Sequence, residues 1–330
     1  MANLRAGLIG LGMMGRHHAR VLASLDGVDL VGVADAGGDP HGVAGGRQLV
    51  ESIEELIALG LDYCMVAVPT IYHEQIGLAL AEAGVHAMIE KPLAQDTPSA
   101  RRLAEAFASK GLVGAVGHIE RYNPALQSAR ARLEAGELGK VYQVTTRRQG
   151  PFPARIADVG VVKDLATHDI DLTAWVTQQP FISVAARTAF KSGRKFEDLI
   201  AVTGQLADGT VTNHLVNWLS PLKERVTIIT GEKGAFVADT LSADLTFYAN
   251  GSVKVTRDDI AQFRGVSEGD VIRYAIAKPE PLRVEHENFR DAVLGKEARI
   301  VTMEEGLATL AVAEAMIRSA NTGVTVTIEV

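Results

Sequence analysis

The sequence feature that most constrains the fold is a short segment near the N-terminus, the pattern G-x-G-x-x-G at Gly10, Gly12 and Gly15. The first glycine permits a tight turn, the second lets the backbone approach a pyrophosphate, and the third allows close helix–strand packing. The pattern follows the apolar run Ala6–Ile9 directly and leads into a helical pattern, Arg16–Leu25. Free N–H groups at a helix N-terminus attract anions. The segment therefore predicts the first strand, turn and helix of a dinucleotide-binding domain.

Asp35 stands where such a domain needs a carboxylate, at the end of the next predicted strand, Val28–Ala34. A carboxylate there accepts hydrogen bonds from the adenosine ribose and repels a 2′-phosphate. No arginine occurs between Asp35 and Arg47. A glycine turn alone can be purely structural, but together with Asp35 it predicts NAD in preference to NADP. The contacts expected from this part of the chain are those of Gly10, Leu11, Gly12, Met13, Met14, Gly15 and Asp35.

Up to about residue 120 the chain alternates apolar runs with helical patterns. Further strands are expected over Leu61–Val68, Val85–Glu90 and Leu112–Val116, and helices over Ser52–Leu59, Ile71–Ala83 and Ser99–Lys110. Fully apolar strands separated by helices are typical of a parallel sheet that is covered on both faces. We therefore expect an α/β Rossmann domain, a doubly wound parallel sheet, over residues 1–120.

The pattern changes after residue 120. A helix is expected over Asn123–Ala135, with Asn123 as its N-cap, and a strand over Val141–Arg147. Further β-rich runs are separated by turn residues such as Asp208-Gly209, which indicates hairpins. Helical patterns recur over Leu165–Val176, Val284–Leu294 and Met303–Ser319. Residues 121–330 are therefore expected to form an α+β domain with a mostly antiparallel sheet.

Composition excludes several function classes. The 330 residues carry a formal net charge of −7, which argues against a protein that binds nucleic acid by bulk charge. No uncharged apolar run approaches the roughly 18–20 residues that cross a bilayer. The single cysteine, Cys64, cannot form an internal disulfide and is typical of a reducing compartment. We expect a cytoplasmic protein without nucleic-acid or membrane partners.

Lys91 is the first candidate for chemistry. Glu90-Lys91-Pro92 lies at the carboxyl end of the predicted strand Val85–Glu90, where open α/β sheets bind ligands. Pro92 restricts the loop and favours a fixed position for Lys91 at the cleft. The alternative is a solvated charge pair before a proline turn.

Asp164 and His168 are the second candidates, four residues apart on a predicted helix and hence on one face. A histidine beside a carboxylate can take the proton from a hydroxyl while hydride leaves the same carbon. Alternatively, the acids only complement the helix dipole and the histidine is buried. A metal site with Asp169 and Asp171 fits less well, because His168 and Asp169 point about 100° apart around a helix. No metal is expected.

Several segments together resemble the glucose–fructose oxidoreductase/inositol dehydrogenase (Gfo/Idh/MocA) family over the whole chain. They are the glycine turn with His18, Val68-Pro69-Thr70 with His73, Glu90-Lys91-Pro92-Leu93-Ala94, Gly117-His118, and Asp164 followed by His168. The resemblance implies a catalytic trio of Lys91, Asp164 and His168, with His168 as acid/base. It also implies that residues 121–330 form a substrate-binding and oligomerisation domain with an open, mostly antiparallel sheet, and that the protein is a homodimer or homotetramer. Further cofactor contacts are expected from Pro69, Thr70, His73, Glu90 and Lys91.

A narrower resemblance, to nucleotide-sugar dehydrogenases, rests on residues 117–124, 148–155 and 158–164. It implies oxidation of a UDP-linked N-acetylhexosamine at C3. Independently, Arg121, Arg148 and Arg155 offer bidentate donors suited to a diphosphate; ordinary surface or inter-domain salt bridges are the alternative. The expected substrate contacts are Lys91, His118, Arg121, Tyr122, Asn123, Arg148, Arg155, Asp164 and His168.

Three other functions stay open from the sequence. One is a free cyclitol or monosaccharide dehydrogenase or a ketosugar reductase. Another is an NAD-dependent glycoside hydrolase that oxidises its substrate transiently. The third is a non-catalytic dinucleotide-sensing regulator, against which the complete set of Lys91, Asp164 and His168 argues.

Overall fold

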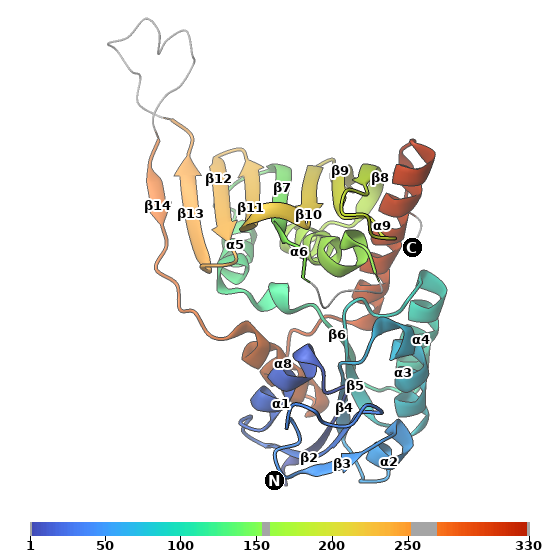
Figure 1. The fold of residues 1–330 in the computed structure, drawn as a ribbon. Coiled ribbons are helices and arrows are strands. Elements are labelled where there is room, and N and C mark those ends of the chain that lie inside the picture. The colour runs from blue at the N-terminus through green and yellow to red at the C-terminus, as the bar shows by residue number, and fades with distance from the viewer. Residues whose placement is uncertain (1, 154–158, 252–268, 329–330) are drawn as a thin grey trace, which may run out of the picture. The chain divides into compact units, whose positions relative to one another are not determined.

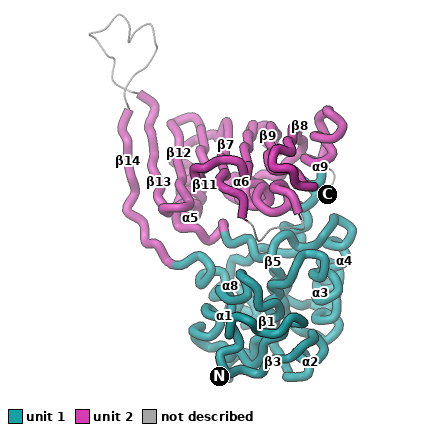
Figure 2. Tube along the Cα trace, viewed as in Figure 1, with its two compact units in different colours: residues 1–119, 280–314 teal, residues 120–279, 315–330 magenta. Residues whose placement is uncertain are grey.

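The computed structural model describes residues 2–153, 159–251 and 269–328. It divides into two compact units, coloured separately in Figure 2. Unit 1 comprises Met1–Ile119 and Glu280–Glu314, and unit 2 comprises Glu120–Pro279 and Ala315–Val330.

Unit 1 is built on a six-stranded parallel sheet with the strand order β3-β2-β1-β4-β5-β6 (Figure 1). Its strands are β1 (Leu4–Ile9), β2 (Val28–Ala34), β3 (Gln48–Val50), β4 (Tyr63–Val66), β5 (His86–Glu90) and β6 (Gly114–Gly117). The order reverses between β1 and β4. Such a switch point is where open α/β sheets bind ligands, beyond the carboxyl ends of the strands. The predicted parallel sheet is confirmed, with β3 as an addition.

Both faces of this sheet are covered, as expected. Alternate residues of β4 join different cores: Cys64 and Val66 pack in one apolar cluster, and Tyr63 and Met65 in another. The helices of unit 1 are α1 (Met13–Leu22), α2 (Ile53–Ile57), the 3₁₀ turn η1 (Thr70–Tyr72), α3 (His73–Glu82), α4 (Thr97–Ser109), α8 (Pro281–Val293) and the first part of α9 (Met303–Thr322).

The sequence analysis expected residues 121–330 as one domain. The first unit is interrupted after Ile119 and resumes at Glu280, so that residues 280–314 group with unit 1. The reason is apolar packing. Phe289 of α8 meets Tyr63 edge to face, with ring centroids 5.4 Å apart, and Met303 and Leu307 of α9 lie in a core of unit 1.

Unit 2 contains a nine-stranded sheet in the order β14-β13-β12-β11-β7-β10-β9-β8-β15. Neighbouring strands are antiparallel except for β7 and β10, which pair in parallel, so the predicted mostly antiparallel sheet is confirmed. The strands are β7 (Val141–Pro151), β8 (Phe181–Ala189), β9 (Leu199–Leu206), β10 (Val211–Asn217), β11 (Leu219–Gly231), β12 (Gly234–Asp239), β13 (Asp244–Ala249), β14 (Val271–Arg273) and β15 (Val326–Thr327).

Helices cover one face of this sheet. Leu126 of α5 (Pro124–Glu134) and Leu172 of α6 (Thr167–Thr177) pack in one core with Val144 of β7 and Phe236 of β12. The 3₁₀ turn η2 (Ile119–Tyr122) precedes α5, and a π-helical turn, η3 (Val162–Ala166), precedes α6. Because side chains alternate along a strand, the helix-covered face of β7 also includes Arg148, while Arg147 lies on the opposite face.

Candidate active site

The three glycines of the turn are required for different reasons. Gly10 has φ +95° and an added Cβ would lie 2.5 Å from the backbone of Ala67, while a Cβ at Gly15 would lie 1.9 Å from the carbonyl oxygen of Gly10. A Cβ at Gly12 would meet no atom within 4 Å. The first and third positions are therefore fixed by packing, whereas the second faces open space at the N-cap of α1. This arrangement fits the approach of a pyrophosphate to the helix N-terminus.

Asp35 follows the last residue of β2 and connects that strand to the glycine turn. Its Oδ2 accepts the backbone N–H of Leu11 at 2.7 Å, and its Oδ1 accepts that of Gly37 at 2.7 Å. Arg47, the nearest arginine in sequence, donates to the carbonyl of Ala44 instead. Among the described residues, no guanidinium forms an ion pair with Asp35. A carboxylate in this setting fits a ribose with free 2′- and 3′-hydroxyls better than one carrying a 2′-phosphate.

His73 links the loops that follow β4 and β5. Its buried ring lies with Nδ1 2.9 Å from the carbonyl oxygen of Pro92 and Nε2 3.0 Å from that of Val68. Both loops leave the carboxyl ends of neighbouring strands. The predicted cofactor residues Pro69 and Thr70 lie at the start of η1 in the first of these loops.

Lys91 is half-buried and directly follows Glu90, the last residue of β5. A cis peptide bond joins it to Pro92. The carboxylate of Glu90 makes two contacts with residues of unit 1. Its Oε2 accepts the backbone N–H of Lys91, and its Oε1 lies 2.9 Å from Nε2 of His18. This gives Glu90 a contact that the expected cofactor role did not include.

Asp164 and His168 lie in consecutive helical segments of unit 2. Asp164 is buried within the π-helical turn η3, and His168 is half-buried in the first turn of α6. The prediction of one regular helix from Leu165 onwards needs correction, because residues 162–166 form the wider π turn. Single π-helical turns occur frequently at functional sites.

Glu197 holds the beginning of this segment in place. Its carbonyl oxygen accepts the backbone N–H of Val161 at 3.0 Å, and its Oε1 accepts that of Val162 at 3.1 Å. A Cβ at Gly160 would lie 2.0 Å from the same carboxylate oxygen. The glutamate thus satisfies N–H groups that the helix start leaves unpaired, a role that the sequence analysis did not find.

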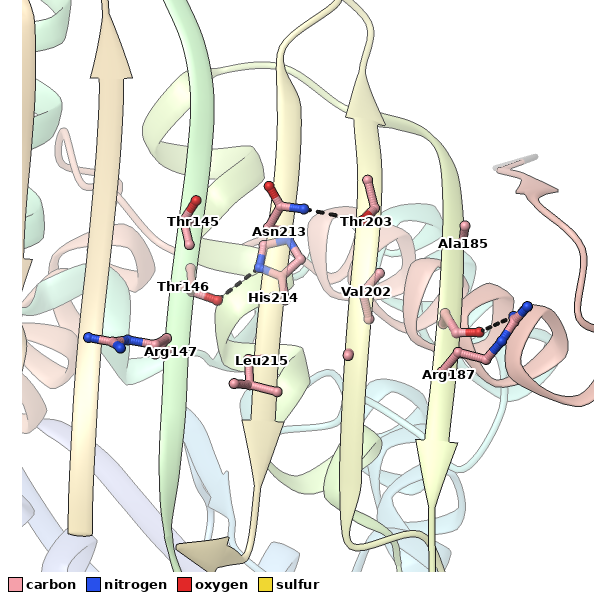
Figure 3. A pocket seen from close by; sticks show the side chains of 12 residues that line it. Thr145, Thr146, Arg147, Ala185, Arg187, Val202, Thr203, Asn213, His214 and Leu215 are labelled. Carbon is pink, nitrogen blue, oxygen red and sulfur yellow. Dashed lines mark hydrogen bonds between the residues drawn. The ribbon is translucent and has the colours of Figure 1, made fainter. Parts of the chain in front are cut away.

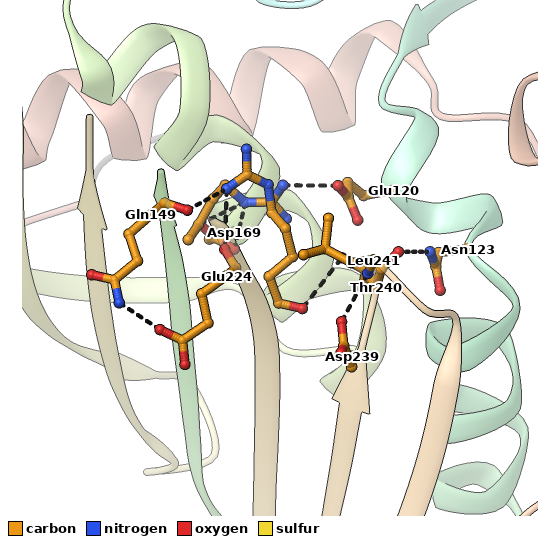
Figure 4. A network of polar contacts seen from close by, with 10 residues as sticks. Glu120, Asn123, Gln149, Asp169, Glu224, Asp239, Thr240 and Leu241 are labelled. Carbon is orange, nitrogen blue, oxygen red and sulfur yellow. Dashed lines mark hydrogen bonds and ion pairs between the residues drawn. The ribbon is translucent and has the colours of Figure 1, made fainter. Parts of the chain in front are cut away.

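Two buried arginines hold α6 from the side. Arg148 is 3 % exposed and donates from Nε to both oxygens of Asp169, at 3.1 and 3.0 Å, and from Nη1 to Glu120 at 2.8 Å (Figure 4). Arg121 makes a two-point contact with Asp171, with distances of 2.8 and 2.6 Å. The sequence analysis offered these arginines to a diphosphate, with salt bridges as the alternative, and the structure shows both of them in salt bridges. Asp169 and Asp171 belong to α6, the helix that carries His168.

Burial shifts the pKa values in this cluster. Burial raises the pKa of Asp169 to about 6, although Arg148 acts against it. For Glu120, burial also acts to raise the pKa, but the charge of Arg148 prevails and lowers it. Burial and the charge of Arg148 lower the pKa of Arg225. Arg148 therefore compensates the charges of two buried carboxylates, Asp169 and Glu120.

The other predicted substrate residues are placed in different ways. His118 is buried after β6 in unit 1, and Tyr122 is buried in η2 of unit 2. Asn123 caps α5, as the sequence predicted: its Oδ1 accepts the backbone N–H of Ala125, and its Nδ2 donates to the carbonyl of Thr240. Arg155 lies outside the described residues.

A separate depression lies on the nine-stranded sheet, over β7, β8, β9 and β10 (Figure 3). Its lining includes Thr145, Arg147, Arg187, Thr203 and Asn213. None of the predicted site residues belongs to it. In the part of the chain that the structure describes, no three His, Cys, Asp or Glu side chains are grouped to hold a metal, and none of the helices is long and apolar enough to cross a membrane.

Two family models match this chain. The "Oxidoreductase family, NAD-binding Rossmann fold" covers residues 4–118, and the "Oxidoreductase family, C-terminal alpha/beta domain" covers residues 130–328. The matched segments cover most of both structural units.

Individual relatives are similar over different lengths. UDP-N-acetylglucosamine 3-dehydrogenase of Acidithiobacillus ferrooxidans is 30% identical over 89% of this chain and 90% of its own length. Its crystal structure superposes with a TM-score of 0.84, at 27% identity, over 98% of this chain and 99% of that one. The WlbA dehydrogenase of Bordetella pertussis, solved with NADH and UDP-GlcNAcA, gives a TM-score of 0.80 at 25% identity over 99% of each chain. The NAD⁺-dependent scyllo-inositol 2-dehydrogenase of Bacillus subtilis is 31% identical over 55% of this chain and 56% of its own.

Proposed function

The chain belongs to the Gfo/Idh/MocA oxidoreductase family, and from this premise we propose that it oxidises the C3 hydroxyl of a UDP-linked N-acetylhexosamine with NAD. The coarser statement, an NAD-dependent oxidoreductase that acts on a sugar CH–OH group, follows from the family and its named relatives. The observation that carries the finer proposal is the similarity to a UDP-N-acetylglucosamine 3-dehydrogenase over about nine-tenths of both chains.

The residues of unit 1 fit the cofactor. The N-terminus of α1 with the open position at Gly12 would hold the pyrophosphate, and Asp35 would hold the adenosine ribose. The loops joined by His73 would border the nicotinamide end. NAD, when bound, supplies the acceptor for the hydride that leaves the sugar carbon.

The chain's own residues handle the proton of the hydroxyl. His168 accepts this proton as the carbonyl forms, since a histidine can act as a general base near neutral pH. Lys91 donates a hydrogen bond to the same oxygen and stabilises the negative charge that develops on it. Asp164, buried in the π turn, orients the site. The C–H and O–H bonds break together with formation of the ketone, and the reverse steps reduce it.

The nucleotide part of the substrate requires cationic donors. Arg148 and Arg121 are engaged by carboxylates of α6, so we propose that they support the substrate site by positioning this helix. Direct diphosphate contact is then proposed for Arg155, with His118 and Tyr122 near the sugar. Replacing Arg155 by Ala should raise KM for the UDP-sugar about 10- to 100-fold, the value of a charge-assisted contact, and leave the NAD Kd unchanged.

Oxidation of a free cyclitol is the second candidate, because a relative over about half of the chain is a scyllo-inositol 2-dehydrogenase. NADH formation at 340 nm should be compared for UDP-N-acetylglucosamine, free N-acetylglucosamine and the inositols. We expect the UDP-sugar to give the highest kcat/KM. Higher kcat/KM with an inositol would replace the proposal by this candidate. Sugar release without net NADH would instead favour the hydrolase, and no reaction with any compound would favour a regulator.

A further inference from the structure

Three buried titratable side chains lie behind Lys91 in unit 1. They are His18 of α1, Glu90 of β5 and His286 of α8, with exposed fractions of 0 %, 9 % and 1 %. Nε2 of His18 is 2.9 Å from Oε1 of Glu90, and its Nδ1 is 2.8 Å from Nε2 of His286. The two rings meet edge to face, with centroids 5.1 Å apart. The second carboxylate oxygen of Glu90 accepts the backbone N–H of Lys91 at 3.1 Å.

The contacts from His286 through His18 to Glu90 form a hydrogen-bond relay, and the chemistry of the groups fixes its direction at Glu90. Burial acts to raise the pKa of Glu90, but the hydrogen bond and charge of His18, with the charge of Lys91, prevail and lower it. An ionised carboxylate only accepts hydrogen bonds, so His18 donates from Nε2. Burial, with His18 beside it, lowers the pKa of His286 well below its usual value, so this ring is neutral.

His286 is joined to the hydrogen-bond relay through one nitrogen alone, Nε2. Its Nδ1 is buried and has no hydrogen-bond partner among the described residues. The hydrogen bond between Nε2 and His18 is therefore the polar contact that this side chain makes among the described residues. Without it, His18 would have a buried nitrogen left unpaired, which is costly in an apolar interior, and the ring could turn away from Glu90.

We propose that His286 is a positioning residue for Lys91: through Nε2 it orients His18, which holds the Glu90 carboxylate against the backbone N–H of Lys91. The role of Lys91 in the reaction rests on the proposed function, whereas the support of its backbone does not. The inference also assigns a role to residues 280–314 within unit 1, because α8 supplies His286 to the hydrogen-bond relay.

The choice of replacement separates positioning from packing. Phenylalanine at 286 keeps a buried ring but has no nitrogen. The amide of glutamine reaches the position of Nε2, whereas the amide of asparagine reaches only that of Nδ1. His286→Gln should therefore preserve the hydrogen bond to His18, whereas His286→Phe and His286→Asn should remove it. His17→Gln, a change at an exposed neighbour of His18, is the control.

Steady-state kinetics of the full-length protein provide the first readout. For His286→Phe and His286→Asn we expect kcat to fall about 10- to 100-fold, as when the supporting hydrogen bonds of a reacting group are lost. KM and the NAD Kd should change little, and His286→Gln and His17→Gln should stay near wild type. Wild-type kcat in the Phe variant, or equal losses in the Phe and Gln variants, would overturn the inference.

Hydrogen exchange at the Lys91 amide is a readout that needs no substrate. We expect faster exchange in His286→Phe than in wild type, with His286→Gln close to wild type, because the amide loses its acceptor when Glu90 moves. If no sugar is oxidised by the wild type but the exchange pattern holds, the proposed function fails and the positioning role stands. Unchanged exchange in the Phe variant would refute the positioning role.

Discussion

The two segments that carry the proposed catalytic groups rest on buried charges that are compensated differently. Behind Lys91, one carboxylate, Glu90, is held by the imidazole of His18. Beside His168, Arg148 holds two carboxylates at once. A guanidinium is always charged and carries five N–H donors, whereas an imidazole has only two ring nitrogens for hydrogen bonds.

This difference assigns separate tasks to the two networks. The permanent charge of Arg148 makes the support of α6 a matter of folding stability, because removing one partner leaves charges buried in an apolar interior. The neutral ring of His286 can be lost without an unpaired charge, so the support of Lys91 is a matter of precise placement. Variants of Arg148 should therefore change mainly stability, and those of His286 mainly kcat.

The largest expected effect comes from Arg148, compared with its neighbour on β7. Arg147 pairs with Glu224 on the opposite face, with its side chain 51 % exposed. Arg148→Met should lower the free energy of unfolding by about 3–5 kcal/mol, because Asp169 and Glu120 lose their partner. Arg147→Met should cost at most about 1 kcal/mol. Urea unfolding of both variants checks this, and similar losses would contradict the contrast between buried and exposed pairs.

A smaller effect is expected for Asp169 as the pH changes. Its pKa of about 6 in the folded protein lies above the ordinary 3.8, so between these values the folded state holds a proton that the unfolded chain has lost. The contribution of this group to stability is therefore present below pH 4 and is lost as the pH rises to 6. At 1.36 kcal/mol per pH unit, the loss is on the order of 2–3 kcal/mol.

Asp169→Asn isolates this contribution, because Asn has no proton to lose. The unfolding free energies of the variant and the wild type should be measured from pH 4 to pH 7. We expect the variant to gain on the wild type as the pH rises through this interval. Parallel curves would mean that Arg148 keeps Asp169 ionised throughout.

The smallest effect concerns the cofactor side of unit 1. Asp35→Ser with Ala36→Arg should weaken NAD about 10- to 100-fold and improve NADP, because a repelling carboxylate is replaced by a cation. Fluorescence titration of both cofactors gives the two Kd values, and Asp35→Asn, which keeps an acceptor for the Leu11 N–H, is the control. A wild type that already prefers NADP would refute the role of Asp35.

The sequence predicted those features that depend on neighbouring residues. The glycine turn, the cap at Asn123 and the apolar strands are local patterns, and the structure contains them. The strand β3 has only three residues and follows a glycine-rich loop, so its pattern is too short to detect. The π turn around Asp164 differs from an α-helix by a fraction of a residue per turn, which apolar periodicity does not resolve.

Contacts between residues far apart in the sequence could not be predicted from local patterns. His18 and His286 are separated by 268 positions, and their contact depends on the return of α8 to unit 1. Arg148 was noted as an unusual cation, but its position on the same face of β7 as Val144 was the signal for burial. A guanidinium on the apolar face of a strand requires a buried carboxylate, and Asp169 in α6 supplies one.

The most direct test of the proposed chemistry is a double-mutant cycle on Lys91 and His168, measured by single-turnover NADH formation with the UDP-sugar. If both groups act on one hydroxyl, each change to Ala should slow the reaction about 10²- to 10⁴-fold. The double variant should then be about as slow as the slower single variant, because residues that act as a unit are not additive. Losses that multiply, or a His168→Ala variant with a near-normal rate, would contradict a shared role for Lys91 and His168.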